Sequence, residues 1–445
     1  MTDGMRQAGK LGLWSGVGLV VADMVGTGVL TTAGFMAPNL APTEILLAWL
    51  VGALAALAGA RAYAALARAV PRSGGEYRYL STLLHPAAGT LAGWTSLLVG
   101  FSMPVALAAL AAGAFVETLW PQLSSAHAAY GLVIGITAMH VVGLRFSRRA
   151  QDVLVLVKGA LLLAFVIIGL ALGAHALPAP SPALAVRSLP LEPFFVSLVF
   201  ISFCFSGWNA AIYAAEEFAA PARDVPRAML IGCALVAGLY LLVNFVFVAN
   251  LGPSELGGWL EGDTRRITLA HLVMTKLVGD TGARVMSVAV IVALASAVSA
   301  MTVIGPRVYA AMARDGSLPR VLAGAQGRPP VGAILLQAVL ALVLVQSYRF
   351  RELLEHVGAI LALVTALTAL SLFRVRFGRT SVPPEDRPGV LPLACATIYA
   401  TLSGWMIVFA VRNDPDVLRW IAGLIVIAGV AHFASVLTRS KQAAQ

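Results

Sequence analysis

Charged residues are scarce in this sequence, at 12% of 445 residues, whereas hydrophobic residues make up 59%. About a quarter of the residues of a soluble globular domain are charged. The few charges here fall in short stretches between long apolar runs, which is the pattern of a chain that crosses a bilayer many times. The composition therefore excludes a soluble domain and predicts an all-α polytopic membrane protein.

Cysteine is also rare, and no group of metal ligands or catalytic residues stands out. Cys204, Cys233 and Cys395 all lie inside apolar segments, where a free thiol behaves as a small buried apolar residue. The seven histidines form no cluster, and neither a zinc-type Cys/His spacing nor a Ser-His-Asp arrangement is visible. We therefore expect no metal site, no cofactor and no enzyme activity.

The formal net charge of +10 could suggest a nucleic-acid partner, but its distribution argues against one. The basic residues lie in short connections that flank apolar runs, as membrane orientation signals do. With the N-terminus inside, the inner connections hold about twice as many Lys and Arg residues as the outer ones. This predicts a multi-pass protein of the cytoplasmic membrane with both termini in the cytoplasm and no nucleic-acid partner.

Twelve apolar segments reach the length of about 20 residues that a helix needs to cross a bilayer. We expect them all to belong to a single transporter domain, residues 1–445. The segments are 12–37, 43–67, 87–118, 126–144, 150–174, 193–218, 226–250, 281–310, 331–348, 353–373, 390–411 and 416–437.

Two of these segments carry residues that interrupt a membrane helix. The first has Gly26-Thr27-Gly28 near its centre, and the sixth has Ser206-Gly207. Interrupted segments at corresponding places in two halves indicate an inverted-repeat transporter. We therefore predict discontinuous helices 1 and 6 in a 5+5 inverted repeat, with 12–174 and 193–373 as the two repeats. Helices 11 and 12, at 390–437, are an addition.

Unwinding a helix inside the membrane exposes backbone groups, which is tolerable only where they line a cavity or meet a ligand. Freed N–H groups suit a carboxylate and freed C=O groups suit an ammonium group. Two such breaks can hold a zwitterion without a charged side chain. The alternative is that the glycines only permit close helix packing, but a second break in register makes that explanation weaker.

Several motifs occur in order along the chain and resemble the amino acid–polyamine–organocation superfamily of permeases over roughly residues 10 to 440. They are VGTGVL at 25–30, PRSGGEYRYL at 71–80, FSGWN at 205–209, PARDVP at 221–226 and RVYAAMARDGSLP at 307–319. The resemblance implies alternating access and an amino acid bound between helices 1 and 6.

The resemblance also assigns roles to residues at the two breaks. The amides of Gly26, Thr27 and Gly28 would hold the α-carboxylate. Phe203 would be an aromatic gate, with core packing as the alternative for it and for Trp208. Carbonyls around 203–205 would hold the α-amine. The substrate-binding residues expected in helix 6 are Phe203, Cys204, Phe205, Ser206, Gly207, Trp208 and Asn209.

Lys158 lies within the fifth apolar segment, and an ionisable residue there is a functional hypothesis by default. The alternative is that its ammonium group snorkels to the interface. In sodium-independent members of the superfamily a helix 5 lysine replaces a cation. By this resemblance Lys158 would contact carbonyls of helix 1 near Ala22 and Val25, with Asp23 as a titrating neighbour. This predicts sodium-independent transport, either proton-coupled or by exchange.

The end of helix 6 suggests an inner gate formed by Glu217 and Arg307, with a solvated helix end as the alternative. A disulfide-linked heavy subunit would need a cysteine between helices 3 and 4, and residues 120–127 contain none. We therefore expect no such partner.

The function predicted from these features is secondary active transport of an amino acid, with a neutral amino acid favoured because Asp23 is the only acidic group expected near the pocket. An amino acid/amine antiporter is the first alternative. A nutrient sensor that binds without transporting is the second, and it usually needs a larger soluble tail. The lipid bilayer, the amino acid and a proton are the expected partners.

Overall fold

The computed structural model describes residues 11–26, 28–142, 148–177, 189–252, 263–314, 316–324, 330–378, 382–384 and 387–443. Within them the regular structure is helical, apart from a parallel bridge between Leu11 and Phe218. The all-α class predicted from the composition is therefore confirmed.

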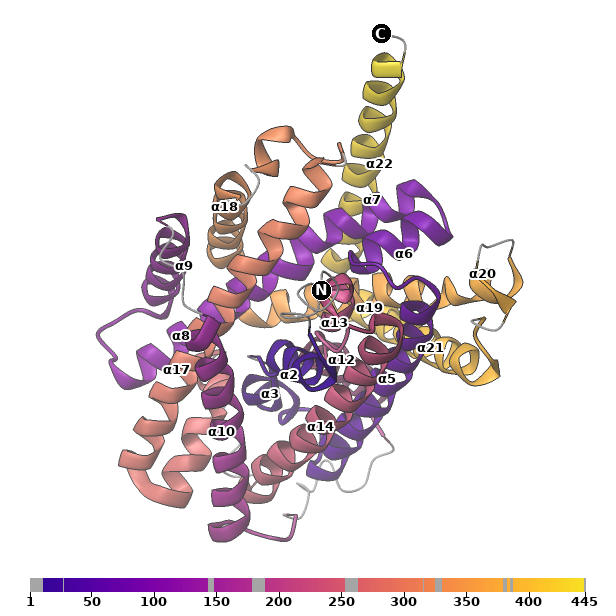
Figure 1. The fold of residues 1–445 in the computed structure, drawn as a ribbon. Helices are drawn as coiled ribbons and strands as arrows, with labels where there is room; N and C mark the ends of the chain where they lie inside the picture. Colours follow the sequence, from indigo (N-terminus) through magenta and orange to yellow (C-terminus); the bar gives the residue numbers. More distant parts are fainter. Residues whose placement is uncertain are drawn as a thin grey trace, which may run out of the picture.

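Figure 1 shows the helices in colours that follow the sequence. They are α2 Leu13–Met24, α3 Gly28–Thr31, α4 Ala33–Met36, α5 Pro42–Ala69, α6 Gly75–Leu83, α7 Pro86–Thr95, the π-helix η1 Ser96–Ser102, α8 Met103–Leu119, α9 Ser125–Val141, α10 Arg148–Leu172, α12 Leu191–Cys204, α13 Ala210–Tyr213, the 3₁₀-helix η2 Ala215–Glu217, α14 Pro221–Asn250, α16 Asp263–Ile267, α17 Leu269–Arg314, the 3₁₀-helix η3 Arg320–Ala323, α18 Val331–Ser347, α19 Phe350–Leu370, α20 Leu372–Phe377, α21 Val390–Asn413 and α22 Asp416–Ala443.

Each of the twelve predicted apolar segments contains helix. Among the described residues, eight helical stretches are long and apolar enough to cross a membrane, and 156–172, 191–204 and 331–347 are shorter apolar helices. The polytopic character is thus confirmed, whereas the count of twelve spans stays a prediction. The N-terminal part of α17 ends at Gly279, whose φ of 75° departs from the helix.

Acidic side chains fix the starts of two long helices. The backbone N–H of Ala41 donates to Glu44 Oε2 at 2.8 Å, at the start of α5. The N–H of Arg349 donates to Glu352 Oε2 at 2.9 Å, at the start of α19. Such contacts satisfy backbone donors that the first helical turn leaves free.

The two interrupted helices lie at the centre of the bundle. In Figure 1, α2 and α3 occupy the middle of the view beside α12 and α13. α14 packs against both α2 and α5, and α10 packs against α17. The discontinuities predicted in the first and sixth helices are both present, between Met24 and Gly28 and between Cys204 and Ala210.

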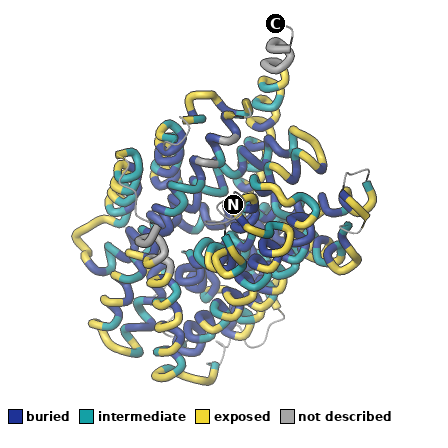
Figure 2. The backbone as a smooth tube through the Cα atoms, in the orientation of Figure 1, coloured by how far each residue is buried: buried dark blue, intermediate teal, exposed yellow. Residues whose placement is uncertain are grey.

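Burial falls from the centre to the edge of the bundle, as the dark core and lighter rim of Figure 2 show. In the stretch Pro86–Leu119, 78% of the most apolar window is buried, against 17% in Asp416–Val436. The exposed face of α22 carries Val426, Val430 and Phe433, which suits contact with lipid. The stretch Pro86–Leu119, which is the third predicted helix, therefore lies at the centre of the bundle, and α22 lies at its edge.

Candidate substrate-binding site

A cavity of about 1740 Å³ extends from the helix interruptions to one end of the bundle. Gly26 and Gly28 line its inner end from the first helix, and Ser206 and Gly207 line it from the sixth. The same cavity is also lined by Leu11, Ser73, Arg78, Arg314, Ala323 and Pro330. These residues lie in connections and helix ends that the sequence predicts to be cytoplasmic.

The break in helix 1 is a tight turn whose carbonyls are satisfied by side chains from other helices. Val25 has φ −73° and ψ 84°, close to an inverse γ-turn, and the Gly26 N–H donates to the Met24 carbonyl at 2.8 Å. Tyr240 Oη of α14 donates to the same carbonyl at 2.6 Å. Unwound backbone in a membrane needs such partners.

The break in helix 6 fits directly against the break in helix 1. Gly207 has φ 102°, which L-residues with a side chain rarely adopt. A Cβ atom there would lie 2.8 Å from Asp23 Oδ2 and 3.0 Å from the Met24 nitrogen. A Cβ atom on Gly28 would lie 2.5 Å from Cys204 Sγ. Both glycines are therefore required for the two breaks to meet.

Lys158 reaches the first break from α10. Its side chain is 6% exposed, and Nζ donates to the carbonyl of Ala22 at 3.3 Å. Lys158 also interacts electrostatically with Asp23. Ala22, Asp23 and Lys158 line the cavity together. The expected second contact, with Val25, is not among those that the described residues make.

Most of the expected helix 6 residues line the cavity, and for Phe205 the role expected of its backbone carbonyl stays a prediction. Phe203, Cys204, Trp208 and Asn209 line it beside Ser206 and Gly207. Phe205 does not, because its ring packs against Trp49 and Tyr240 at centroid distances of 6.0 and 5.3 Å. Thr27 and the side chain of Arg307 lie outside the described residues.

The expected gate of Glu217 and Arg307 stays a prediction, because the side chain of Arg307 lies outside the described residues. Glu217 lines the cavity, and its backbone carbonyl accepts from the Leu11 N–H at 2.8 Å. Arg223, on the same stretch of chain, pairs with Asp224 at 2.8 Å. Backbone pairing between 11 and 217–219 thus joins the start of helix 1 to the end of helix 6.

A buried carboxylate in the cavity wall was missed by sequence reasoning. Glu76 of α6 accepts from Asn209 Nδ2 at 2.5 Å and from Tyr213 Oη at 2.5 Å. Tyr63 of α5 donates to it at 3.2 Å. The only sequence signal was its place in the motif at 71–80, which did not say where the side chain pointed.

Four more of the predicted helices complete the wall. They are helices 3, 8, 10 and 11, which correspond to α7–η1–α8, α17, α19 and α21 in the structure. Helix 3 is a π-helix at η1, where Ser96, Gly100 and Phe101 face the cavity, and π-helical turns are frequent at functional sites. Ser296 of α17 also lines the cavity. Ser102 does not, because it is buried and its Oγ donates to the Leu97 carbonyl at 2.7 Å.

Two further polar contacts in the wall were not predicted. Thr365 of α19 and Tyr399 of α21 both line the cavity, and their hydroxyls are 2.7 Å apart. His140 of α9 also lines the cavity and contacts Ser299 Oγ of α17 at 2.9 Å. Helix 11, which contains Tyr399, therefore reaches the site.

A bundle of apolar helices with two interrupted helices meeting at a cavity is the architecture of a secondary transporter. The sequence profile of the family described as "Amino acid permease" matches residues 11–431. The chain belongs to this amino acid permease family.

Named relatives cover nearly the whole chain. The human "Large neutral amino acids transporter small subunit 2" is 27% identical, over 97% of this chain and 81% of the human protein. The human "Asc-type amino acid transporter 1" is 26% identical, over 97% and 83%. The mouse "b(0,+)-type amino acid transporter 1" is 24% identical, over 95% and 87%. All three are named as amino acid transporters.

Proposed function

We propose that this protein is a secondary active transporter of neutral amino acids that works by alternating access and does not need sodium. The observation that carries the proposal is the contact of Lys158 Nζ with the Ala22 carbonyl, beside two helix breaks that face a cavity. A fixed ammonium group at this position supplies the positive charge that a bound cation would otherwise bring.

The zwitterionic part of the substrate binds at the breaks in this proposal. The amides of residues 26–28 hold the carboxylate, and the carbonyls of residues 203–205 hold the ammonium group. In the present conformation the Gly26 N–H is bonded to the Met24 carbonyl. Carboxylate binding at Gly26 therefore exchanges a turn hydrogen bond for a charge-assisted one.

The composition of the wall supports a neutral side chain. Apolar residues of helices 3, 8 and 10 line the cavity, namely Phe101, Ala300, Met301, Ile304 and Leu361. Such a wall favours the binding of a substrate that buries apolar surface. The names of the relatives, among them "Large neutral amino acids transporter", agree with this substrate class.

The cavity opens at the end predicted to face the cytoplasm, which supports an inward-open conformation with both termini inside. We further propose that 12–174 and 193–373 form an inverted repeat and that 390–437 follows it. The name of one relative includes "small subunit", but residues 120–127 of this chain lack cysteine. We propose that it has no disulfide-linked partner.

Reconstituted protein tests the proposal. A thermal-shift screen of the amino acids first selects a ligand, and uptake of the labelled ligand is then measured in proteoliposomes with sodium or choline. We expect uptake to be stimulated by internal ligand and unchanged when sodium is replaced. Uptake that strictly required a sodium gradient would contradict the proposal, and ligand binding without any flux would favour a sensor.

A further inference from the structure

The cavity wall contains a polar cluster centred on a carboxylate that the transport chemistry described above does not use. Its centre is the carboxylate of Glu76, which is 5% exposed and lies in the cavity wall. Its donors are the hydroxyls of Tyr63 and Tyr213 and the amide of Asn209. We call these four residues the Glu76 clamp.

The local backbone is built to bring Glu76 to this place. Gly74 and Gly75 have φ values of 124° and 55°, so the chain turns in a conformation that favours glycine. A Cβ atom on Gly75 would lie 2.3 Å from the ring of Tyr213. The turn therefore fits directly against Tyr213, and Glu76, the next residue, meets the hydroxyl of the same side chain.

A neighbouring contact ties the same turn to helix 6. The N–H of Glu216 donates to Ser73 Oγ at 3.0 Å. Asn209, Tyr213 and Glu216 all follow the break at Gly207, so the whole segment after the break is held by the turn at 73–76. The N–H of Ala219 donates to the Leu11 carbonyl at 3.0 Å, which extends the connection to helix 1.

The clamp joins two groups of helices. Tyr63, Asn209 and Tyr213 belong to helices 2 and 6, whereas α6 packs against α7 of helix 3 and α19 of helix 10. Leu80 of α6 forms an apolar cluster with Ala92 of α7 and Val364 of α19. Alternating access requires helices around the site to move relative to one another, so contacts between the two groups bias the equilibrium.

We propose that Glu76 is a positioning residue that holds the segment after the helix 6 break in the inward-open conformation. An ionised carboxylate can accept from all three neutral donors, and hydrogen bonds to a charged acceptor are stronger than those between neutral groups. This role rests on the proposed transport function. The hydrogen bonds of the Glu76 clamp stabilise the inward-open conformation relative to the outward-open one.

The test compares three variants of similar size. Glu76→Gln removes the charge and one acceptor, and Tyr213→Phe removes one donor. Tyr79→Phe is the matched control, because Tyr79 lies on the same helix and packs against Tyr63 with ring centroids 6.3 Å apart. Its buried hydroxyl has no hydrogen-bond partner among the described residues. A general loss of packing would affect all three variants alike, and a more apolar ring would affect both Tyr→Phe variants alike.

The first measurement is the ratio of the external to the internal KM for the selected amino acid in oriented proteoliposomes. The apparent affinity on each side depends on the fraction of protein that is open to it. We expect the ratio to fall about tenfold in Glu76→Gln and about threefold in Tyr213→Phe. It should stay unchanged in Tyr79→Phe. An unchanged or increased ratio in a transporting Glu76→Gln would overturn the inference.

The second measurement does not depend on transport. Ser15 lines the cavity and is exposed, so Ser15→Cys reports the open mouth by its rate of maleimide labelling, with the Ser15 parent giving the background of the native thiols. We expect Glu76→Gln and Tyr213→Phe to slow labelling about twofold or more. Equal labelling rates in all variants would refute the proposed role of Glu76. The expected slowing of labelling in a protein that transports nothing would refute only the transport proposal.

Discussion

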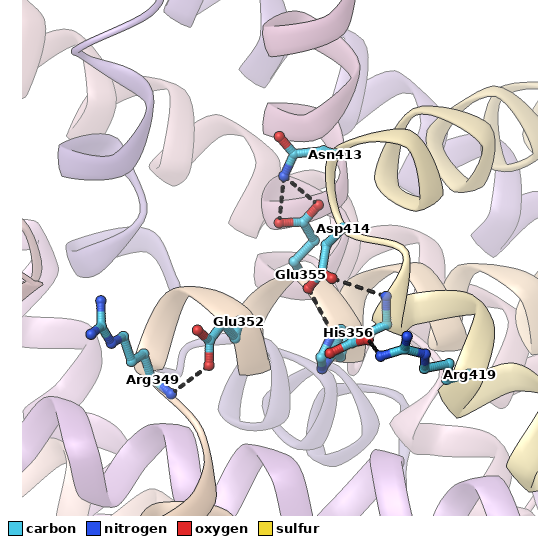
Figure 3. Close-up of polar contacts among 8 residues, drawn as sticks. Arg349, Glu352, Glu355, His356, Asn413, Asp414 and Arg419 are labelled. Atoms are coloured by element: carbon cyan, nitrogen blue, oxygen red, sulfur yellow. Dashed lines mark hydrogen bonds and ion pairs between the residues drawn. The ribbon is translucent and has the colours of Figure 1, made fainter.

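Two of the buried carboxylates among the described residues, Glu76 and Glu355, differ in what surrounds them. Glu76 lines the cavity and is held by residues of helices 2 and 6. Glu355, at the start of α19, is 2% exposed and accepts from Asn413 Nδ2 at 2.8 and 3.0 Å. Figure 3 shows this second cluster, in which the neighbouring His356 contacts Asp414 Oδ2 at 3.0 Å.

The second cluster joins α19 to the connection between α21 and α22, and none of its residues lines the cavity. The same helix serves both regions, because Thr365 of α19 lines the cavity and accepts from Tyr63 through its carbonyl at 3.4 Å. Ten residues of helix place the two regions about 15 Å apart. A buried carboxylate is therefore not in itself a sign of function, and changes to the two regions should have different consequences.

Substitution at the breaks should have the largest effect. Gly207→Ala forces a Cβ atom to within 2.8 Å of Asp23 Oδ2 at a φ of 102°. A left-handed residue costs about 1–2 kcal/mol, and overpacking about 1–3 kcal/mol more. We expect initial transport rates in proteoliposomes to fall about a hundredfold or more.

Gly404→Ala is the control, since a Cβ atom there meets nothing within 4 Å and alanine is the better helix former. It should transport normally. If Gly207→Ala transported as well as Gly404→Ala, the two breaks would not need to meet closely. Transport would then be no more sensitive to substitution at the cavity than at the second cluster.

Loss of Lys158 should have the next largest effect. Lys158→Ala removes the donor to the Ala22 carbonyl and leaves Asp23 without the cation with which it interacts. A backbone carbonyl at the break that loses its donor costs about 1–3 kcal/mol, so we expect transport to fall at least about tenfold.

Comparison with Asp23→Asn and with the double variant shows the origin of that loss. Asp23→Asn should express normally, and the double variant should recover part of the transport if an uncompensated Asp23 causes the loss. Full activity of Lys158→Ala would remove the coupling role. A pH profile of uptake that was identical in wild-type protein and Asp23→Asn would remove the proton role of Asp23.

The breaks could be predicted from sequence because their cause is local. A pair of glycines inside an apolar run is unfavourable in a helix wherever the rest of the chain lies, and Gly26 and Gly207 are both at interruptions. The position of Lys158 within an apolar segment was equally local. The same holds for the twelve apolar segments, all of which contain helix.

Contacts between distant parts of the chain could not be predicted in this way. Glu76 meets partners 13, 133 and 137 positions away, and no local pattern encodes those distances. Phe205 was assigned with its neighbours from a motif, yet its side chain turns away from the cavity toward Trp49. Tyr399 contacts Thr365 from 34 positions away, and no pattern within one segment indicates that contact.

The smallest effect on transport should come from the second cluster. Asn413→Ala leaves the buried Glu355 carboxylate without the amide that donates to both its oxygens, which costs about 1–3 kcal/mol. We expect a lower thermal-shift midpoint but an unchanged KM. Arg419→Ala, which breaks the exposed pair with Asp416, should change stability by less than about 1 kcal/mol. A changed KM in Asn413→Ala would mean that both carboxylate clusters take part in transport, because only a shift in the conformations or in the site moves that constant.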